Sequence, residues 1–411
     1  MFIDRDAVGE LREHQGLWQF SYAAQWQARE NAFDLAPSLP RSAGLIADGA
    51  SERPVQWFFD NLLPEEAART LLAQDAQVEH ADAFGLLASY GAESAGALTL
   101  RLPGSEPEAG GLQPLPAEAL SERIRRLPRA SLAAQAPKRM SLAGAQHKLA
   151  VVVRGGELFE PIGSFPSTHI LKPDHPDPEL YPHSVANEGF VMELARRCGL
   201  PVPAVQWRRV PEPIYLIERF DRATAQDLPK RLYVLDACQL LGIEAIWKYQ
   251  QATLGTLARL LAMCRSRAAT RLALFRWLVF NLIVGNNDSH LKNLSFFVRP
   301  EGVELAPHYD LLCTSVYAPG NGWLETELVW KTATMRRHHD VRRAPVLEMA
   351  IALGVPPTAA AREIDRQCLL VPRAAAELYT AQAPTLLAGE ARLLRQVVHG
   401  VIRDMATRLA A

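Results

Sequence analysis

The chain carries the stretch Gly285-Asn286-Asn287-Asp288-Ser289-His290-Leu291-Lys292-Asn293 directly after its most apolar run, residues 272–284. That run is interrupted by Arg276 and Asn281 and is too short to cross a bilayer, so we predict a buried helix that ends near Gly285. A turn rich in Asn and Asp after a helix is often a simple cap, because these residues adopt turn conformations easily. A catalytic role for this stretch therefore needs support from functional residues elsewhere in the chain.

The spacing inside this stretch favours a chemical role. Phosphoryl transfer needs a carboxylate that orients and deprotonates the acceptor hydroxyl, together with oxygen ligands for the magnesium that bridges the phosphates. Asp288 and Asn293 are five positions apart, the separation of the catalytic aspartate and the metal-binding asparagine in kinase catalytic loops. Asp310 follows the strand-like run 294–298 and fits the second metal ligand. Lys292 could neutralise the phosphate being transferred.

A second set of residues, earlier in the chain, fits nucleotide binding. A helix over 184–197, with Ser184 as its N-cap, is predicted to pack on a small sheet. The strands cover 148–153, 157–160, 168–172, 202–210 and 214–218, and the pair Gly155-Gly156 indicates a hairpin between the first two. Lys172 ends the third strand, where kinases place the lysine that grips the α- and β-phosphates. Glu188, on the predicted helix, could pair with Lys172.

A loop of small residues, 141–148, precedes the first of these strands. Small side chains allow backbone N–H groups to approach phosphates. The candidate ATP-binding residues of this loop are Ala143, Gly144, Ala145, Gln146, His147 and Lys148. At the crossover that follows the sheet, backbone groups of Glu218, Arg219 and Phe220 could hydrogen-bond adenine, and Asp221 could reach a ribose hydroxyl.

The order of these patterns predicts an α+β protein with a two-lobed, protein-kinase-like core. The 411 residues are too many for one ordinary core and indicate two or three packed regions. We expect an N-terminal α+β subdomain over 1–101 and a linker over 102–137, which contains the breaker Pro103-Gly104-Ser105-Glu106-Pro107 and a short helix near 117–126. A nucleotide-binding sheet lobe over 138–222 and an all-helical catalytic lobe over 223–411 complete the prediction.

Composition restricts the possible partners and compartments. A net charge of −1 gives no overall attraction to nucleic acid or anionic membrane. The five cysteines are scattered and form no CxxC pair, so we expect reduced, mostly buried thiols. The N-terminus shows no secretory signal pattern, which favours a cytoplasmic protein without a membrane partner.

A concentrated positive cluster lies near the end of the expected catalytic lobe. It contains Lys331, Arg336, Arg337, Arg342 and Arg343, with His338 and His339 between them. A solvated loop is its commonest explanation, and contact with DNA phosphates or a phosphorylated loop is the alternative.

Short motifs occur in a fixed order along most of the chain. They are SLAGAQHK at 141–148, THILKP at 168–173, NE at 187–188, GLPVP at 199–203, ERFDR at 218–222, CQ at 238–239, KY at 248–249, GNNDSHLKN at 285–293 and YD at 309–310. The segments FFDNLLP at 58–64 and GAL at 96–98 add an N-terminal set. In this order the motifs resemble those of the HipA-type toxin kinases of bacterial toxin–antitoxin modules.

The resemblance implies a protein serine/threonine kinase that uses ATP and Mg²⁺, with Asp288 as catalytic base and Asn293 and Asp310 as metal ligands. ATP would contact the loop 143–148, Lys172 and the hinge 218–220. The resemblance further implies a HipB-type helix-turn-helix antitoxin, operator DNA bound mainly through that antitoxin, and an aminoacyl-tRNA synthetase as target, chiefly the glutamyl enzyme. A serine at the position of Ser141 can be autophosphorylated in that family, which would repel ATP from the loop.

Two other functions remain open from the residues. One is a small-molecule phosphotransferase on the same fold, although antibiotic kinases place a histidine two residues before the aspartate, whereas His290, which we include in the catalytic set, follows Asp288. The other is a catalytically quiet corepressor that acts with a DNA-binding partner.

Overall fold

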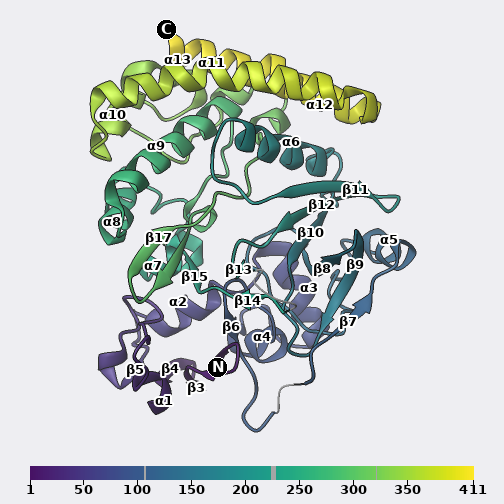
Figure 1. The fold of residues 1–411 in the computed structure, drawn as a ribbon, viewed down its shortest axis with the longest axis vertical. Coiled ribbons are helices and arrows are strands. Elements are labelled where there is room, and N and C mark those ends of the chain that lie inside the picture. Colours follow the sequence, from purple (N-terminus) through teal and green to yellow (C-terminus); the bar gives the residue numbers. More distant parts are fainter. Residues whose placement is uncertain (106–107, 224–227, 321) are drawn as a thin grey trace. The chain divides into compact units, whose positions relative to one another are not determined.

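A computed structural model describes residues 1–105, 108–223, 228–320 and 322–411 (Figure 1). Glu106 and Pro107 of the predicted linker, and residues 224–227 and 321 of the predicted catalytic lobe, lie outside the described residues. The chain forms two compact units. Unit 1 contains Met1–Pro176, Arg208–Trp247 and Ser295–Gly302, and unit 2 contains Asp177–Trp207, Lys248–Leu294 and Val303–Ala411.

The N-terminal part of unit 1 combines short strands with helices, as predicted. Its elements are β1 (Phe2–Ile3), β2 (Asp6–Ala7), β3 (Gly9–His14), β4 (Leu17–Tyr22), α1 (Ala24–Gln27), β5 (Leu45–Ala47), α2 (Pro54–Asp60), α3 (Glu66–Ala76), α4 (Ala83–Tyr90) and β6 (Leu98–Thr99). In β4, Trp18, Phe20 and Tyr22 are buried and alternate with less buried residues, which gives the strand one core-facing side. The Phe20 ring packs 5.9 Å from the Phe59 ring of α2.

The part of unit 1 that is predicted to bind nucleotide is built on a larger sheet. Its elements are β7 (Gly111–Pro114), α5 (Ala117–Arg125), β8 (Leu149–Arg154), β9 (Glu157–Ile162), β10 (His169–Pro173) and β12 (Pro213–Glu218), and the strands lie in the order β12-β10-β8-β9-β7. The predicted hairpin is confirmed, because Arg154 pairs with Glu157 across Gly155 and Gly156. Both glycines have positive φ (59° and 87°), which a two-residue hairpin turn requires. The short helix predicted near 117–126 is confirmed as α5.

The region predicted as all-helical also contains strands. They are β13 (Arg222–Ala223), β14 (Lys230–Arg231), β15 (Val234–Asp236), β16 (Ser295–Arg299) and β17 (Gly302–Leu305), and α7 (Ala237–Leu241) follows β15. β15 pairs antiparallel with β16 within unit 1. β16 confirms the strand-like run 294–298. The other four strands were not predicted, because each has four residues or fewer and so shows little periodicity. β11 (Val205–Arg209) and β17 each cross a boundary between the units.

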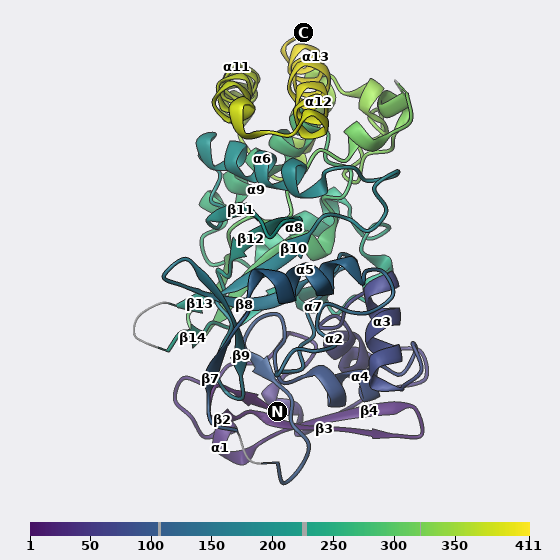
Figure 2. The same ribbon diagram turned by 90° about the vertical axis from the view of Figure 1, so that its right-hand side faces the viewer.

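Unit 2 is a helical assembly around α9 (Figure 2). Its helices are α6 (Ser184–Arg197), α8 (Leu254–Met263), α9 (Arg267–Val284), α10 (Arg343–Ala352), α11 (Pro357–Gln382), α12 (Ala388–Gln396) and α13 (Arg403–Ala410), with a π-helical turn over Val397–Ile402. α9 packs against α8, α10, α11 and α13, and α6 packs against α11 and α12. Trp277, Phe275 and Phe280 of α9 are fully buried, which confirms the predicted buried helix.

Two details differ from the sequence expectation. α9 begins at Arg267 rather than near 272, because its first turn carries polar residues that the apolar run excludes. His183, in a left-handed conformation, precedes α6 where Ser184 was expected to cap it. The packing of α6 on the sheet stays a prediction, because the helix belongs to unit 2 and the sheet to unit 1.

All five cysteines are free thiols, and four of them are buried, as expected. Among the described residues, no helix is both long enough and apolar enough to span a membrane.

Candidate active site

The candidate catalytic loop begins where α9 ends. Gly285 adopts a left-handed conformation (φ 68°), and its N–H donates to Leu282 O. A Cβ at this position would lie 2.6 Å from Val401 Cγ1 and 2.9 Å from Ser315 Oγ. Glycine is therefore required here both by the backbone conformation and by the lack of space.

Side-chain amides fix the backbone around Asp288. Asn286 Oδ1 accepts the Asp288 N–H at 2.9 Å, and Asn293 Nδ2 donates to Asp288 O at 2.6 Å. Asn286 is itself held by a hydrogen bond from its Nδ2 to Asn281 Oδ1 of α9 at 2.7 Å. The Asp288 side chain remains 40% exposed, so the loop presents an acid group to solvent from a fixed backbone.

Two side chains approach the Asp288 carboxylate from within unit 2. The Tyr249 hydroxyl donates a hydrogen bond to Asp288 Oδ1. His290 Nε2 lies 3.8 Å from the same oxygen. The Tyr249 and His290 rings meet edge to face, with centroids 4.8 Å apart, and His290 is buried.

The candidate metal ligands are Asn293, at the end of this loop, and Asp310, which follows later in the chain. Asn293 is buried, and because its Nδ2 is used on Asp288 O, its Oδ1 is the atom available to a cation. Asp310 is half-buried and adopts a left-handed conformation (φ 57°) that is uncommon outside glycine. The preceding Tyr309 donates its hydroxyl proton to Lys292 O at 2.7 Å, which ties the Asp310 segment to the catalytic loop. One amide oxygen and one carboxylate form a donor set that fits Mg²⁺.

Asn187 of α6 holds the chain just beyond Asp310. Its Nδ2 donates to Cys313 O and its Oδ1 accepts the Cys313 N–H, both at 2.9 Å. This reciprocal pair gives both the oxygen and the nitrogen of the buried Asn187 side chain a hydrogen-bond partner. It also fixes the path of the chain at Cys313. Glu188, the neighbouring residue of the same motif, is also buried.

Side chains between Thr314 and His338 form hydrogen bonds with the candidate catalytic loop. Asn287 N donates to Thr314 Oγ1 at 2.6 Å, and Asn287 Nδ2 donates to Thr326 Oγ1 at 2.8 Å. Trp330 Nε1 donates to Ser289 O at 2.8 Å. His338 Nδ1 lies 3.0 Å from Thr326 Oγ1, and burial lowers the pKa of this imidazole to about 4.

In unit 1, the loop of small residues has a defined conformation. Gly144 has φ 105°, and a Cβ there would lie 2.4 Å from Lys148 Nζ. Lys148 Nζ donates to Ala143 O at 2.6 Å, and Glu65 N donates to Gly144 O at 3.2 Å. Gln146 Oε1 is buried and has no hydrogen-bond partner among the described residues, as expected for a group that waits for a ligand.

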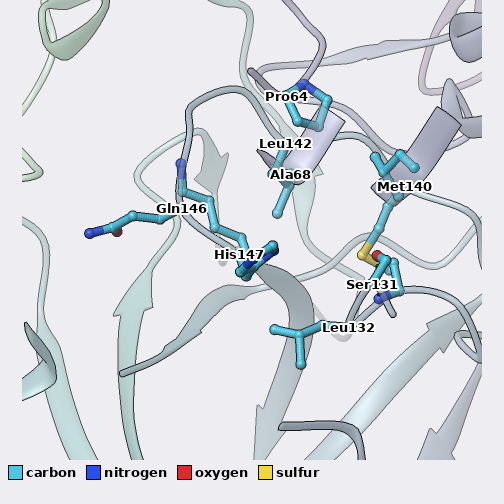
Figure 3. A pocket seen from close by; sticks show the side chains of 11 residues that line it. Pro64, Ala68, Ser131, Leu132, Met140, Leu142, Gln146 and His147 are labelled. Atoms are coloured by element: carbon cyan, nitrogen blue, oxygen red, sulfur yellow. Dashed lines mark hydrogen bonds between the residues drawn. The ribbon is translucent and has the colours of Figure 1, made fainter. Parts of the chain in front are cut away.

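A small cavity adjoins this loop (Figure 3). Its volume is about 30 Å³, room for about one water and far too little for a nucleotide. The His147 ring lies among the lining side chains of Ala68, Leu132 and Met140, whereas the Gln146 side chain extends in the opposite direction. Burial lowers the pKa of His147, and the nearby His175 lowers it further.

Ser141 is fully buried at the start of the loop. Its N–H donates to Glu93 O at 2.8 Å, and its hydroxyl donates to Leu62 O at 3.3 Å. A phosphate could reach this hydroxyl only after the segment leaves its present place. Autophosphorylation of Ser141 stays a prediction.

The hinge residues join a buried ion cluster, which we call the Glu93 cluster. Its members are Glu93, Lys138, Asp221, Arg219, Arg222 and Arg231. Burial alone would raise the pKa of Glu93, but the charges of Lys138, Arg222, Arg231 and Arg219 hold that pKa well below its usual value. Asp221 is engaged by Arg219 Nη2 at 2.6 Å and by Gly96 N at 2.8 Å.

The remaining nucleotide-binding candidates lie on strands. Lys172 of β10 is buried, pairs across the ladder with Tyr215, and has its Nζ 5.7 Å from the Tyr215 ring centroid. Glu218 ends β12 and is exposed, and the Phe220 ring packs against Phe297 with centroids 6.1 Å apart. Lys172 belongs to unit 1 and Asp288 to unit 2, so their predicted convergence on one nucleotide stays a prediction.

The positive cluster near 331–343 is largely ion-paired. Lys331 contacts Glu327 at 2.5 Å, Arg337 contacts Glu325 at 3.1 Å, and Arg343 contacts Asp365 at 2.6 Å. These pairs fit the interpretation as a solvated surface. Contact with DNA stays an untested alternative.

Sequence reasoning missed three residues that the structure places in supporting roles: Glu93, Asn187 and Tyr249. Asn187 and Tyr249 belong to the motifs NE and KY, whose order along the chain could have indicated importance without a role. Glu93 precedes the motif GAL, and a lone glutamate there has no distinguishing signal because its partners are 45 to 138 residues away.

Comparisons with known proteins agree with this geometry. Residues 1–101 match the model of the HipA N-terminal domain, and residues 140–375 match that of the HipA-like C-terminal domain. The protein Y4mE of Sinorhizobium fredii is 38% identical over 328 residues, which cover 76% of each chain. The serine/threonine-protein kinase toxin HipA of Shewanella oneidensis is 32% identical over 314 residues, 72% of this chain and 70% of that protein.

The solved complex of Shewanella oneidensis HipA, HipB and operator DNA contains a chain with a fold similar to that of this protein. Its similar chain has a TM-score of 0.83 and 26% identity, and the match covers 100% of this chain and 96% of that chain. The kinase-like α+β fold predicted from the sequence is thereby confirmed. The chain belongs to the HipA family of serine/threonine-protein kinase toxins of toxin–antitoxin systems, and as a protein kinase it uses ATP.

Proposed function

We propose that this kinase transfers the γ-phosphate of ATP to a serine or threonine hydroxyl of a cellular protein, with Asp288 as the base. The observation that carries the proposal is the state of Asp288: its backbone is fixed by Asn286 and Asn293, while its carboxylate stays exposed. Such a group is positioned before the substrate arrives and does not need to reorganise during the reaction.

The chemistry requires one proton transfer and one phosphoryl transfer. The acceptor hydroxyl gives its proton to the Asp288 carboxylate as its oxygen bonds to the γ-phosphorus. The bond between that phosphorus and the ADP oxygen breaks. Asn293 Oδ1 and the Asp310 carboxylate would hold Mg²⁺, which when bound neutralises charge on the phosphates. Lys292 could add positive charge beside the transferred group.

The nucleotide set in unit 1 supports this proposal. The left-handed Gly144 and the buried, unpartnered Gln146 Oε1 suit a loop that takes a phosphate group, and Lys172 is a buried cation on the neighbouring strand. Adenine would bind the backbone of 218–220. The Asp221 carboxylate would reach a ribose hydroxyl only by giving up bonds in the Glu93 cluster.

The resemblance extends the proposal to partners and target. A HipB-like antitoxin and operator DNA bound through it are supported by the similar solved complex. An aminoacyl-tRNA synthetase in the cytoplasm, such as glutamate–tRNA ligase, is proposed as the target from the motif resemblance. Autophosphorylation at Ser141 would place two negative charges in the phosphate-binding loop and switch the kinase off.

The test is phosphate transfer by the purified full chain. The protein is incubated with γ-labelled ATP, Mg²⁺ and either a cell lysate or purified glutamate–tRNA ligase, and phosphoserine and phosphothreonine are identified by mass spectrometry. Lys172→Met should abolish transfer, whereas Lys331→Met, which removes an ion-paired surface lysine, should retain it. Absence of labelled protein with the wild-type chain would overturn the proposal.

A further inference from the structure

Asn187 is a fully buried polar residue of α6 that has no part in the mechanism above. An amide in such a place costs free energy unless its oxygen and nitrogen form hydrogen bonds within the protein. The partners of the Asn187 amide are 126 to 130 residues away in the chain, in the segment 313–317 of the same unit. The side chain therefore joins α6 to that segment, and the role of the contact depends on what the segment carries.

The contact fixes two successive peptide groups. Asn187 Oδ1 accepts the Cys313 N–H and Asn187 Nδ2 donates to Cys313 O, both at 2.9 Å. The N–H belongs to the peptide group before the Cys313 Cα and the carbonyl to the one after it, so neither group can rotate without breaking a hydrogen bond. Nδ2 also donates to the Tyr317 hydroxyl at 2.9 Å, which fixes the orientation of the amide.

The fixed segment begins three residues after the candidate metal ligand Asp310. Leu311 and Leu312, which lie between Asp310 and Cys313, are buried. Asp310 itself has a φ of 57°, a conformation that is unfavourable for residues other than glycine and that persists where the surrounding structure holds it. The backbone on either side of Asp310 therefore matters to where its carboxylate points.

Two anchors enclose Asp310 along the chain. On one side, the Tyr309 hydroxyl donates to Lys292 O at 2.7 Å, next to the second candidate ligand, Asn293. On the other side, the Asn187 amide holds the chain three residues later. Mg²⁺ demands near-ideal octahedral geometry, so a small displacement of one ligand from the other weakens its binding.

We propose that Asn187 is a positioning residue for the metal site, which holds the backbone after Asp310 so that its carboxylate and Asn293 Oδ1 can bind one Mg²⁺ together. The inference rests on the proposed function, in which these two residues are the metal ligands. The alternative role is structural, in which Asn187 only fastens α6 to the core of unit 2. Ser315 N also donates to Gly285 O at 3.0 Å, so loss of the Asn187 contact should disturb the segment locally rather than unfold it.

Asn187→Ala removes the contact and leaves space in which a water can bond with Cys313. The full chain is saturated with a non-hydrolysable ATP analogue and titrated with Mn²⁺, a paramagnetic substitute for Mg²⁺, while free Mn²⁺ is measured by electron paramagnetic resonance. Positioning predicts that the variant binds Mn²⁺ about tenfold more weakly than the wild type, the effect of losing about one hydrogen bond. The Mg²⁺ concentration for half-maximal phosphate transfer should rise by a similar factor, with little change in KM for ATP at saturating Mg²⁺. Wild-type affinity of Asn187→Ala for Mn²⁺ would overturn the proposal.

Gln367→Ala is the matched control, because Gln367 is an equally buried amide of unit 2 that joins α11 to α9. Its Nε2 donates to Arg276 O at 3.0 Å and to Glu363 Oε1 at 3.1 Å. Both variants should lower the melting temperature, but Gln367→Ala should keep the wild-type affinity for Mn²⁺. Equal Mn²⁺ affinities in the two variants would assign Asn187 the structural role alone and overturn the proposal.

A second variant and the wild type complete the test. If Asn187→Ala does not fold, Asn187→Ser, which retains a hydroxyl in the buried place, is titrated instead, and weaker Mn²⁺ binding is again expected. If the wild type binds Mn²⁺ but labels no protein, the proposed function fails, whereas the titration still decides whether Asn187 acts on the metal site. Absence of Mn²⁺ binding by the wild type would overturn both.

Discussion

At the scale of single residues, Gly285 determines how the catalytic loop leaves α9. The left-handed turn brings Asn286 back to Asn281, and Asn286 in turn holds Asp288. Because Gly285 has no Cβ, the turn can form, and the hydrogen bonds that follow it lead to Asp288, the candidate base.

Gly285→Ala should lower both stability and activity. A left-handed alanine costs about 1–2 kcal/mol, and its Cβ would force Val401 or Ser315 to move. We expect a lower melting temperature and a loss of ADP release that exceeds the loss of folded protein. Gly400→Ala is the control, because a Cβ there meets nothing within 4 Å. Equal behaviour of the two variants would contradict this account of the turn.

At the scale of elements, the segment from Thr314 to His338 is the support of the catalytic loop. His338 contacts Thr326, Thr326 contacts Asn287, and Asn287 is adjacent to Asp288. The imidazole is fully buried, so its charge state matters to this segment.

The stability of the protein should therefore depend on pH through His338. Burial lowers its pKa from 6.5 to about 4, although a hydrogen bond with the Thr326 backbone raises it slightly. Between pH 6.5 and pH 4 the unfolded chain binds a proton at His338 and the folded chain does not. The contribution of His338 to the free energy of unfolding is therefore complete above pH 6.5 and is lost as the pH falls towards 4. The loss reaches about 3 kcal/mol.

The measurement is urea unfolding of wild type and His338→Gln at pH 7 and pH 4.5. The variant should lose less stability on acidification, because glutamine does not titrate. His308 and His169, with pKa values lowered by burial to about 3 and about 4, contribute acid sensitivity that both proteins share. An identical loss in the two proteins would contradict the role of His338.

At the scale of the molecule, the Glu93 cluster joins distant segments of unit 1. Glu93 accepts hydrogen bonds from Lys138, Ser167, Arg222 and Arg231, while its backbone oxygen holds Ser141. The same residue thus contacts Ser141, at the start of the loop predicted to bind ATP, and Arg222, next to the predicted hinge. Removing its charge leaves buried cations without compensation.

Glu93→Gln should destabilise unit 1 by about 3–5 kcal/mol, the usual cost of breaking a buried ion pair from one side. ATP binding should weaken as well, because Lys138, which precedes the loop 141–148 by three residues, loses its charged partner. Thermal unfolding with and without ATP and Mg²⁺ measures both effects. Glu10→Gln, which breaks an exposed pair with Arg12, should change neither. A wild-type melting temperature for Glu93→Gln would show that the cluster is not a structural anchor.

Local signals in the sequence were sufficient for much of the fold. The Gly155-Gly156 hairpin, α5, α6 and the buried α9 follow from turn residues and from periodicity, which act over a few positions. The candidate site followed from the five-residue spacing of Asp288 and Asn293 and from motif order, and the structure adds their direct hydrogen bond. Their catalytic roles stay predictions.

The remainder depends on contacts that a local pattern does not contain. Tyr249 is 39 residues from Asp288, and Arg231 is 138 residues from Glu93. Charged residues such as Arg219 and Arg222 are normally read as surface, because burial of a charge is favourable only with partners that the sequence does not identify. The division into units is equally non-local, since each unit is assembled from separated segments.

The central claim is that phosphoryl transfer takes place at Asp288. The most direct test compares wild type, Asp288→Asn and Asp365→Asn for transfer from γ-labelled ATP to protein in the presence of Mg²⁺. Asp365 is an exposed aspartate of the same unit, paired with Arg343. We predict that Asp288→Asn loses at least about a hundredfold in rate at an unchanged melting temperature, while Asp365→Asn keeps wild-type activity. Wild-type transfer, or undiminished growth inhibition, by Asp288→Asn would contradict the account.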